Sequence, residues 1–225
     1  MFLSPSDSLN TMTRRNPLAE IVAAIRAATP DWFGKVNDRL VQGLIDSGAV
    51  DGALREDDRM PDFLLPNAEG ALVSSSQLLA NGPLVLSFYR GVWCPYCSEE
   101  LNALAAAAPH LVAAGATVAA ITPEVGGAAL KTKKERDLRF EILCDVDNGV
   151  AMEFGLMFRI PKDIQADYMK FNVNMPKIYG NDGWMIPVPA TYVVGRDGVI
   201  AYAYVNPDYR ERCDPESLVE TVSKL

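Results

Sequence analysis

The run at residues 88–97, Phe-Tyr-Arg-Gly-Val-Trp-Cys-Pro-Tyr-Cys, constrains this chain more than any other feature. Residues 83–89 form a short apolar stretch with the length and aromatic content of a buried strand. Beyond the run, apolar residues recur every three or four positions, which is typical of one helix face. These are Leu101, Leu104, Ala105, Ala108, Leu111 and Val112. The run therefore predicts a strand-to-helix junction that carries two thiols one helical turn apart.

The predicted helix start gives each residue of the Cys-Pro-Tyr-Cys motif a distinct place. Pro95 suits the first helical position, where a missing N–H costs nothing, so Cys94 becomes the N-cap and Cys97 the third helical residue. Unpaired amide groups at a helix N-terminus stabilise an anion such as a thiolate, and cysteines placed there have lowered pKa values. We expect redox chemistry at this site, with Cys94 as the more exposed sulfur.

Two other interpretations of the cysteine pair are possible. The thiols could be inert buried side chains, or they could be half of a zinc site. Zinc normally requires four nitrogen or sulfur ligands with local spacing, whereas Cys144 and Cys213 are isolated and the chain has a single His. The strand context favours the redox interpretation, and we expect no metal.

Composition limits the classes of protein and of partner. A chain of 225 residues with 49% hydrophobic content can bury a full core, so we expect one sizeable domain with a smaller addition. The net charge of −8 argues against nucleic acid. No apolar stretch approaches the roughly 20 residues that span a bilayer, and residues 1–17 lack the order of a secretory signal. We therefore expect a cytoplasmic protein with few disulfides.

The first part of the chain predicts a helical extension over residues 1–58. One apolar stripe follows Pro17, and a second, from Trp32 to Ile45, follows Pro30. This arm could dimerise or dock a partner, or it could simply pack on the main domain. Residues 59–225 then alternate between strand and helix patterns, which predicts an α/β domain.

Several elements of the second domain can be placed from the pattern alone. We expect strands at 116–122 and 140–144, a hairpin of 190–194 with 199–204, and a closing helix over 215–225. The long connection at 158–187 is either a lid over the site or a segment that packs on the sheet edge.

Residues from about 60 to 225 resemble the AhpC/TSA peroxiredoxin-like branch of the thioredoxin superfamily. Three segments carry the resemblance: 60–66 (Met-Pro-Asp-Phe-Leu-Leu-Pro), 87–97, and 188–198, which runs from Val-Pro-Ala-Thr into Arg-Asp-Gly. The resemblance implies a thioredoxin-like fold, in which helices flank a central mixed sheet.

The same resemblance implies roles for individual residues. It puts the peroxidatic cysteine at Cys97 and the family's Glu at Glu100. Two positions depart from the family, because Cys94 stands where it has Thr and Pro189 stands where it has an Arg that binds peroxide oxygens. The segment Val188-Pro189-Ala190-Thr191 is instead similar to the cis-proline loop of thioredoxin-like oxidoreductases, which implies a cis-Pro189 facing the sulfurs.

Three residues around the thiols are supporting candidates. Arg90 either replaces the missing active-site charge or is exposed. Trp93 either shields the first thiol and offers a docking surface or belongs to the core. Tyr96, between Pro95 and Cys97, completes the motif.

Three functions are compatible with these residues. The first is a peroxidase in which a thiolate reduces hydrogen peroxide or an alkyl hydroperoxide and a Cys94–Cys97 disulfide forms. The second is exchange with a protein or glutathione disulfide. Both need a thioredoxin or glutathione system as reductant, and neither needs a bound cofactor. The third is a non-enzymatic redox sensor or partner-binding protein, and a homodimer is possible.

Overall fold

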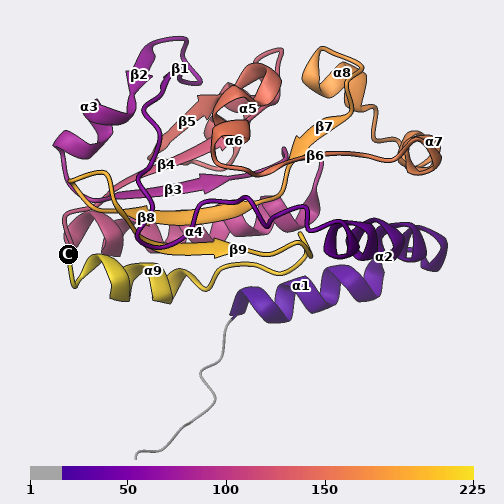
Figure 1. Cartoon of the computed structure of the whole chain (residues 1–225), viewed down its shortest axis with the longest axis horizontal. Coiled ribbons are helices and arrows are strands. Elements are labelled where there is room, and N and C mark those ends of the chain that lie inside the picture. Colours follow the sequence, from indigo (N-terminus) through magenta and orange to yellow (C-terminus); the bar gives the residue numbers. More distant parts are fainter. Residues whose placement is uncertain (1–16) are drawn as a thin grey trace, which may run out of the picture.

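The computed structural model describes residues 17–225, and its centre is a five-stranded mixed sheet with the strand order β5-β4-β3-β8-β9 (Figure 1). Helices flank this sheet, so the predicted thioredoxin-like α/β fold is confirmed. The strands are β3 (Leu84–Phe88), β4 (Thr117–Thr122), β5 (Glu141–Cys144), β8 (Ala190–Val194) and β9 (Ile200–Val205).

Strand β3 lies in the middle of the sheet and leads to the thiols. All five of its residues are buried, which explains why the sequence is apolar there without alternation. It pairs parallel with β4 and antiparallel with β8, where Phe88 lies opposite Ile121 and Ala190. Strand β3 points towards the end of the molecule where α2 and α7 lie (Figure 1). The thiol segment, residues 89–97, follows β3 and therefore lies at that end.

Helices lie around the central sheet, and the last of them, α9, is the C-terminal helix. Helices α4 and α9 pack together, and α1 packs against α4. The predicted closing helix is present as α9, and it buries Leu218 and Val222. The helices are α1 (Pro17–Ala28), α2 (Asp31–Asp46), α3 (Ser75–Ala80), α4 (Pro95–Ala113), α5 (Ala128–Glu135), α6 (Gly149–Glu153), α7 (Lys162–Lys170), α8 (Met175–Tyr179) and α9 (Pro215–Val222), with a 3-10 turn η1 (Val146–Asn148).

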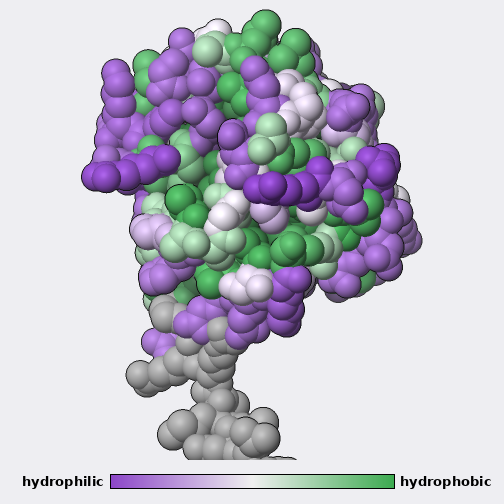
Figure 2. All heavy atoms as spheres, turned by 90° about the vertical axis from the view of Figure 1, so that its left-hand side faces the viewer, coloured by the Kyte–Doolittle hydropathy of each residue, from purple (hydrophilic) through white to green (hydrophobic). Residues whose placement is uncertain are grey.

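Two small antiparallel sheets complete the fold. One joins β1 (Leu64–Pro66) to β2 (Leu72–Ser74), and the other joins β6 (Met157–Arg159) to β7 (Met185–Pro187). The end of the molecule opposite α2 and α7 shows hydrophilic and hydrophobic residues intermixed over its surface (Figure 2).

The helical arm, formed by α1 and α2, packs on the rest of the chain. Its buried side chains belong to the same hydrophobic core as the sheet; they are Leu18, Val22, Phe33, Val36, Leu40, Val41 and Leu44. The predicted stripe is too wide, however, because Trp32 and Ile45 are 46% and 50% exposed. They lie at its two edges, where a helix face turns towards solvent. The division of the chain at residue 58 stays a prediction.

The 158–187 connection packs against the helical arm at the end of the sheet. Its helix α7 contacts α2, and the ring of Phe171 stacks on Phe33 with centroids 3.8 Å apart. Tyr168 on α7 is buried and meets the same Phe33 ring edge-on at 5.4 Å. Segments far apart in sequence therefore close over the start of α4.

The expectation about a secretory signal concerns residues 1–17, of which 1–16 lie outside the described residues. Among the helices that the structure describes, none is long and apolar enough to cross a membrane.

Burial within α2 gives a direct test of whether the helical arm belongs to the folded core. Leu40 is 2% exposed, whereas Ile45 on the same helix is 50% exposed. We expect Leu40→Ala to lower the free energy of unfolding by about 3 kcal/mol, because it removes buried methyl groups and leaves a cavity. Ile45→Ala should change it by less than about 0.5 kcal/mol. Equal effects in denaturant titrations would show that the arm does not contribute to the core.

Candidate active site

The predicted strand-to-helix junction is confirmed. Strand β3 ends at Phe88, Cys94 is the N-cap of α4, and Pro95 is its first residue. The carbonyl of Cys94 accepts the first helical hydrogen bond, from the Ser98 N–H at 3.1 Å. Cys97 is therefore the third residue of the helix, with both sulfurs near the unpaired amide groups of its first turn.

The expectation that Cys94 is the more exposed sulfur is wrong. Cys94 and Cys97 are both free cysteines and both have 0% exposure. Side chains from α2, α7 and the segment before α9 cover the N-cap, among them Phe33, Tyr168 and Tyr209. A reagent must therefore enter between these side chains to reach either sulfur.

Arg90 lies inside the site, so the interpretation of it as an exposed residue is wrong. It is 2% exposed, and its Nη2 donates a hydrogen bond to the Cys94 sulfur at 3.0 Å. Its guanidinium lies 3.6 Å from the Tyr209 ring centroid and 4.9 Å from that of Trp93. A buried guanidinium needs a negative partner, and a Cys94 thiolate supplies one.

A second arginine accompanies the second sulfur. Arg212 is 7% exposed, forms an ion pair with Glu100, and places its Nη2 3.5 Å from the Cys97 sulfur. The Thr191 hydroxyl lies 3.4 Å from Glu100 Oε1. Glu100 and Thr191, both predicted as supporting residues, thus lie behind Cys97 on the sheet side of the site.

The surroundings push the two thiol pKa values apart. Burial opposes ionisation of Cys94, but a hydrogen bond from Cys97 and the charges of Arg90 and Arg212 outweigh it and lower the pKa of Cys94 well below its ordinary value. Burial raises the pKa of Cys97. Its hydrogen bond to Cys94 and the negative charge of Cys94 raise this pKa further, and they outweigh the charges of both arginines, which lower it. These opposite shifts make Cys94 the sulfur of the pair that ionises first.

The cis-proline expectation is wrong. The Val188–Pro189 peptide is trans, as is every other peptide bond among the described residues. The Val188 N–H donates to the Leu156 carbonyl at 2.8 Å, and β8 begins directly after Pro189. The chain between β7 and β8 is therefore fixed at both ends. This segment is buried and reaches the thiol site through Thr191.

Trp93 and Tyr96 form walls around the thiols. The half-buried Trp93 is anchored by its indole N–H, which lies 3.0 Å from the Tyr179 hydroxyl, while that hydroxyl donates to the Arg90 carbonyl at 2.6 Å. Tyr96 is 4% exposed and meets the Tyr209 ring edge-on at 6.0 Å. Trp93 lines the cavity beside Cys94 and also packs against the hydrophobic core, so both interpretations of this residue stay open.

The other two cysteines lie apart from the pair. Cys144 is half-buried at the end of β5, and Cys213 is 2% exposed beside the Tyr202 hydroxyl, with burial raising its pKa to about 12. Within residues 17–225, no group of three His, Cys, Asp or Glu side chains is arranged to hold a metal ion.

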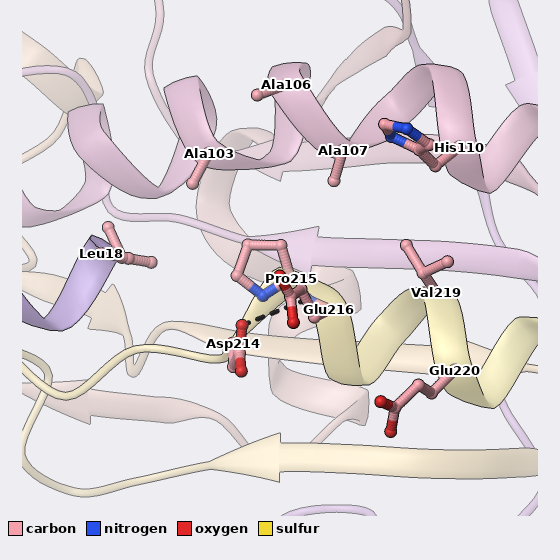
Figure 3. A pocket seen from close by; sticks show the side chains of 10 residues that line it. All are labelled: Leu18, Ala103, Ala106, Ala107, His110, Asp214, Pro215, Glu216, Val219 and Glu220. Atoms are coloured by element: carbon pink, nitrogen blue, oxygen red, sulfur yellow. Dashed lines mark hydrogen bonds between the residues drawn. The ribbon is translucent and has the colours of Figure 1, made fainter. Parts of the chain in front are cut away.

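A groove of about 530 Å³ lies between α4 and α9 (Figure 3). Ala103, Ala107 and His110 line it from α4, Val219 lines it from α9, and Leu18 of α1 lies at one end. Neither sulfur of the pair lines this groove, so the candidate chemistry lies elsewhere.

Sequence reasoning missed several residues of the site. Arg212 and Tyr209 come from the segment before α9, Asn37 comes from the helical arm, and Glu124 follows β4. Glu124 accepts a hydrogen bond from the Val92 N–H at 3.3 Å, and burial raises its pKa to about 7. The only signal for Arg212 was the charged run at 210–212, which as readily describes a solvated surface.

Fold and site together define a thiol protein of the thioredoxin-like class. The AhpC/TSA family model matches residues 57–203 of the chain. The chain therefore belongs to the AhpC/TSA family, as the sequence motifs predicted.

Relatives and solved structures agree with this assignment. The chain is 28% identical over 193 residues to "Peroxiredoxin Q, chloroplastic" of Oryza sativa subsp. japonica, covering 86% of this chain and 73% of the rice protein. It is 27% identical over 172 residues to the Triticum aestivum protein of the same name, covering 76% and 69% of the two chains. A structure of peroxidoxin BcpB from Mycobacterium tuberculosis superposes with a TM-score of 0.60 at 20% identity, covering 76% of this chain and 98% of that one. For Xanthomonas campestris peroxiredoxin Q, the TM-score is 0.56 at 16% identity, with 72% and 90% covered.

Gly91 gives a test of how tightly the thiol segment is held. Its φ is +136°, and a Cβ there would lie 2.6 Å from the Glu124 carboxyl and 2.7 Å from the Trp93 ring. We expect Gly91→Ala to lower the free energy of unfolding by about 2 kcal/mol or more. Gly43→Ala is the matched control, because this helical glycine has open space around it, and it should stabilise by about 0.5–1 kcal/mol. If thermal unfolding showed no loss of stability in Gly91→Ala, the thiol segment would not be held in the way described.

Proposed function

We propose that this chain is a thiol-dependent peroxidase that reduces hydrogen peroxide or alkyl hydroperoxides and closes a Cys94–Cys97 disulfide. The observation that carries the proposal is the pair of buried sulfurs, each with an arginine N–H directed at it. Attack on a peroxide needs a thiolate and positive charge where the leaving oxygen develops negative charge. Membership of the AhpC/TSA family and the likeness to peroxiredoxin Q support it.

The residues of the site divide into three groups under this proposal. Cys94 and Cys97 exchange electrons with the peroxide. Arg90, Arg212 and Glu100 set the charge around them. A third group shapes the walls and the helix start, and consists of Trp93, Pro95, Tyr96, Val188, Pro189 and Thr191.

Burial of the sulfurs limits every exchange step at this site. Both sulfurs are 0% exposed under several side chains, so a protein disulfide, like the reductant that reopens the Cys94–Cys97 disulfide, must displace these side chains to reach them. The Val188–Pro189 peptide is trans, so the structure lacks the cis-proline that the similarity to thioredoxin-like oxidoreductases implied for the disulfide-exchange alternative. The partner-binding alternative loses its main support, because the apolar face of the helical arm is buried within the chain itself.

The reductant, assembly and compartment are further parts of the proposal. A thioredoxin or glutathione system supplies the electrons that reopen the disulfide. A homodimer is also part of the proposal, and the helical arm leaves Trp32 and Ile45 46% and 50% exposed. A cytoplasmic location stays a prediction from the sequence, in which no apolar stretch long enough to span a bilayer and no secretory signal pattern was found.

The proposal predicts that turnover requires both cysteines of the pair. With hydrogen peroxide, thioredoxin, thioredoxin reductase and NADPH, we expect the wild type to turn over and Cys94→Ser and Cys97→Ser each to lose turnover at least a hundredfold. After one equivalent of peroxide, the peptide that contains both cysteines should have lost two hydrogens. The measurements are NADPH consumption and peptide mass spectrometry, repeated with glutathione and glutaredoxin as reductant.

Cys144→Ser is the matched control, because Cys144 lies at the end of β5 and not in the Cys94–Cys97 motif of α4, so turnover should stay unchanged. The proposal fails if the wild type consumes no peroxide. Rapid reduction of insulin disulfides by that same preparation would then support exchange as the activity.

A further inference from the structure

A small cavity of about 70 Å³ opens onto one of the two sulfurs. It is lined by Cys94 and Arg90 on one side, Asn37 and Phe33 of the helical arm on another, and Tyr168 and Phe171 of the 158–187 connection. Cys97 does not line it. A small molecule in this cavity would therefore contact Cys94 and not Cys97, even though both thiols are fully buried.

Two residues that line this cavity, Arg90 and Asn37, have buried polar atoms that form no hydrogen bond within residues 17–225. Nε and Nη1 of Arg90 and Oδ1 of Asn37 lack hydrogen bonds within the described part of the chain, and these residues are 2% and 5% exposed. Leaving a buried donor or acceptor unpaired costs free energy, so such atoms indicate a small polar ligand. The site offers donors from a cation on one side and an acceptor from an amide on the other.

We propose that this cavity is the hydroperoxide-binding site and that Cys94, rather than Cys97, attacks the substrate. The inference rests on the proposed peroxidase function and identifies the sulfur that attacks the peroxide in that reaction. A hydroperoxide, ROOH, carries one O–H donor and oxygen acceptors. Asn37 Oδ1 accepts the O–H, and Arg90 donates to the oxygen that becomes negative as the O–O bond breaks.

The size and walls of the cavity set the class of hydroperoxide. One water needs about 10–15 Å³ of this kind of space, so about 70 Å³ holds the two oxygens of hydrogen peroxide or of a hydroperoxide with a short alkyl group. The rings of Phe33, Tyr168 and Phe171 close the remaining sides with apolar surface. Bulky substrates such as cumene hydroperoxide are therefore excluded by the helical arm.

The reaction balances with the two thiols and an external dithiol. The Cys94 thiolate attacks the terminal oxygen of ROOH, an S–O bond forms, the O–O bond breaks, and the departing alkoxide takes a proton from solvent to leave as ROH. Cys97 then attacks the Cys94 sulfur, the S–S bond forms and the S–O bond breaks, and the leaving hydroxide takes the Cys97 proton to become water. Two electrons pass from the sulfurs to the peroxide, and a protein dithiol or glutathione returns them.

The surroundings of Cys97 suit the second step better than the first. The carboxylate of Glu100 lies behind this sulfur in an ion pair with Arg212, so the arginine's charge there is largely compensated. Arg90 forms no ion pair with a carboxylate of residues 17–225, and its Nη2 donates to Cys94 itself. The lowered pKa of Cys94 and the raised pKa of Cys97 agree with this division.

The test compares two substrates in variants of the cavity wall. We expect Asn37→Ala to slow the stopped-flow reaction with hydrogen peroxide about tenfold, the value of one hydrogen bond in the transition state. Iodoacetamide alkylation of Cys94 should stay unchanged, because the amide contributes to peroxide binding and not to the thiol pKa. Phe33→Leu should raise the rate with cumene hydroperoxide at least threefold relative to hydrogen peroxide, because it enlarges the cavity. Gln42→Ala on the exposed side of α2 is the matched control and should change neither rate.

Trapping the oxidised sulfur identifies the attacking atom. In Cys97→Ser, one equivalent of hydrogen peroxide should give a dimedone-labelled sulfenic acid that persists at Cys94, because no second thiol is present to convert it to a disulfide. Cys94→Ser should react with hydrogen peroxide at least a hundredfold more slowly than the wild type. The inference is overturned if Cys94→Ser keeps the fast reaction, or if Asn37→Ala and Phe33→Leu leave both peroxide rates unchanged. A wild type that consumes peroxide through Cys97 would overturn this inference alone, whereas a wild type inert to peroxide would overturn the proposed function.

Discussion

The contact between the Arg90 guanidinium and the Cys94 sulfur is the interaction on which the chemistry of this site depends. Bringing a guanidinium to 2% exposure is expensive unless a negative charge lies beside it. The helix N-terminus and the Cys97 thiol stabilise that charge on sulfur, while the rings of Tyr209 and Trp93 cover the cation. Each of the two charges therefore offsets part of the free-energy cost of burying the other.

This arrangement also explains how the chain departs from its family without losing the required charge. The position where the family has Thr holds Cys94, and the position of its Arg holds Pro189. Positive charge comes instead from Arg90, four residues before the first sulfur, and from Arg212 near the C-terminus. The family's Glu, at Glu100, keeps a guanidinium partner in Arg212. The same electrostatic requirement is met from other segments of the chain.

The fold could be predicted from the sequence because its signals are local. Proline at the start of α1, α2 and α4 and the apolar runs of β3 and β4 fix those elements within a few residues. The site could be predicted only in part, because several of its residues come together through contacts between distant parts of the chain. Cys94, Cys97 and Glu100 share one helix, whereas Asn37 and Arg212 reach the thiols only through tertiary packing.

Errors in the prediction have the same origin. A helix-cap position favours an exposed Cys94, and a loop position leaves exposure open for Arg90, but the arm and the 158–187 connection cover both residues. The cis isomer expected at Pro189 rests on a similar loop in other proteins, whereas here the peptide between β7 and β8 is trans. No pattern in neighbouring residues encodes these distant contacts.

Titration of thiolate ultraviolet absorbance in the full reduced chain tests the central claim most directly. We predict one thiolate per chain that persists well below pH 8.5, the ordinary value for a free thiol, and is lost as the pH falls through the pKa of Cys94. That signal should remain in Cys97→Ser and disappear in Cys94→Ser. A thiolate that forms only near the ordinary thiol pKa, or one that survives in Cys94→Ser, would contradict the claim.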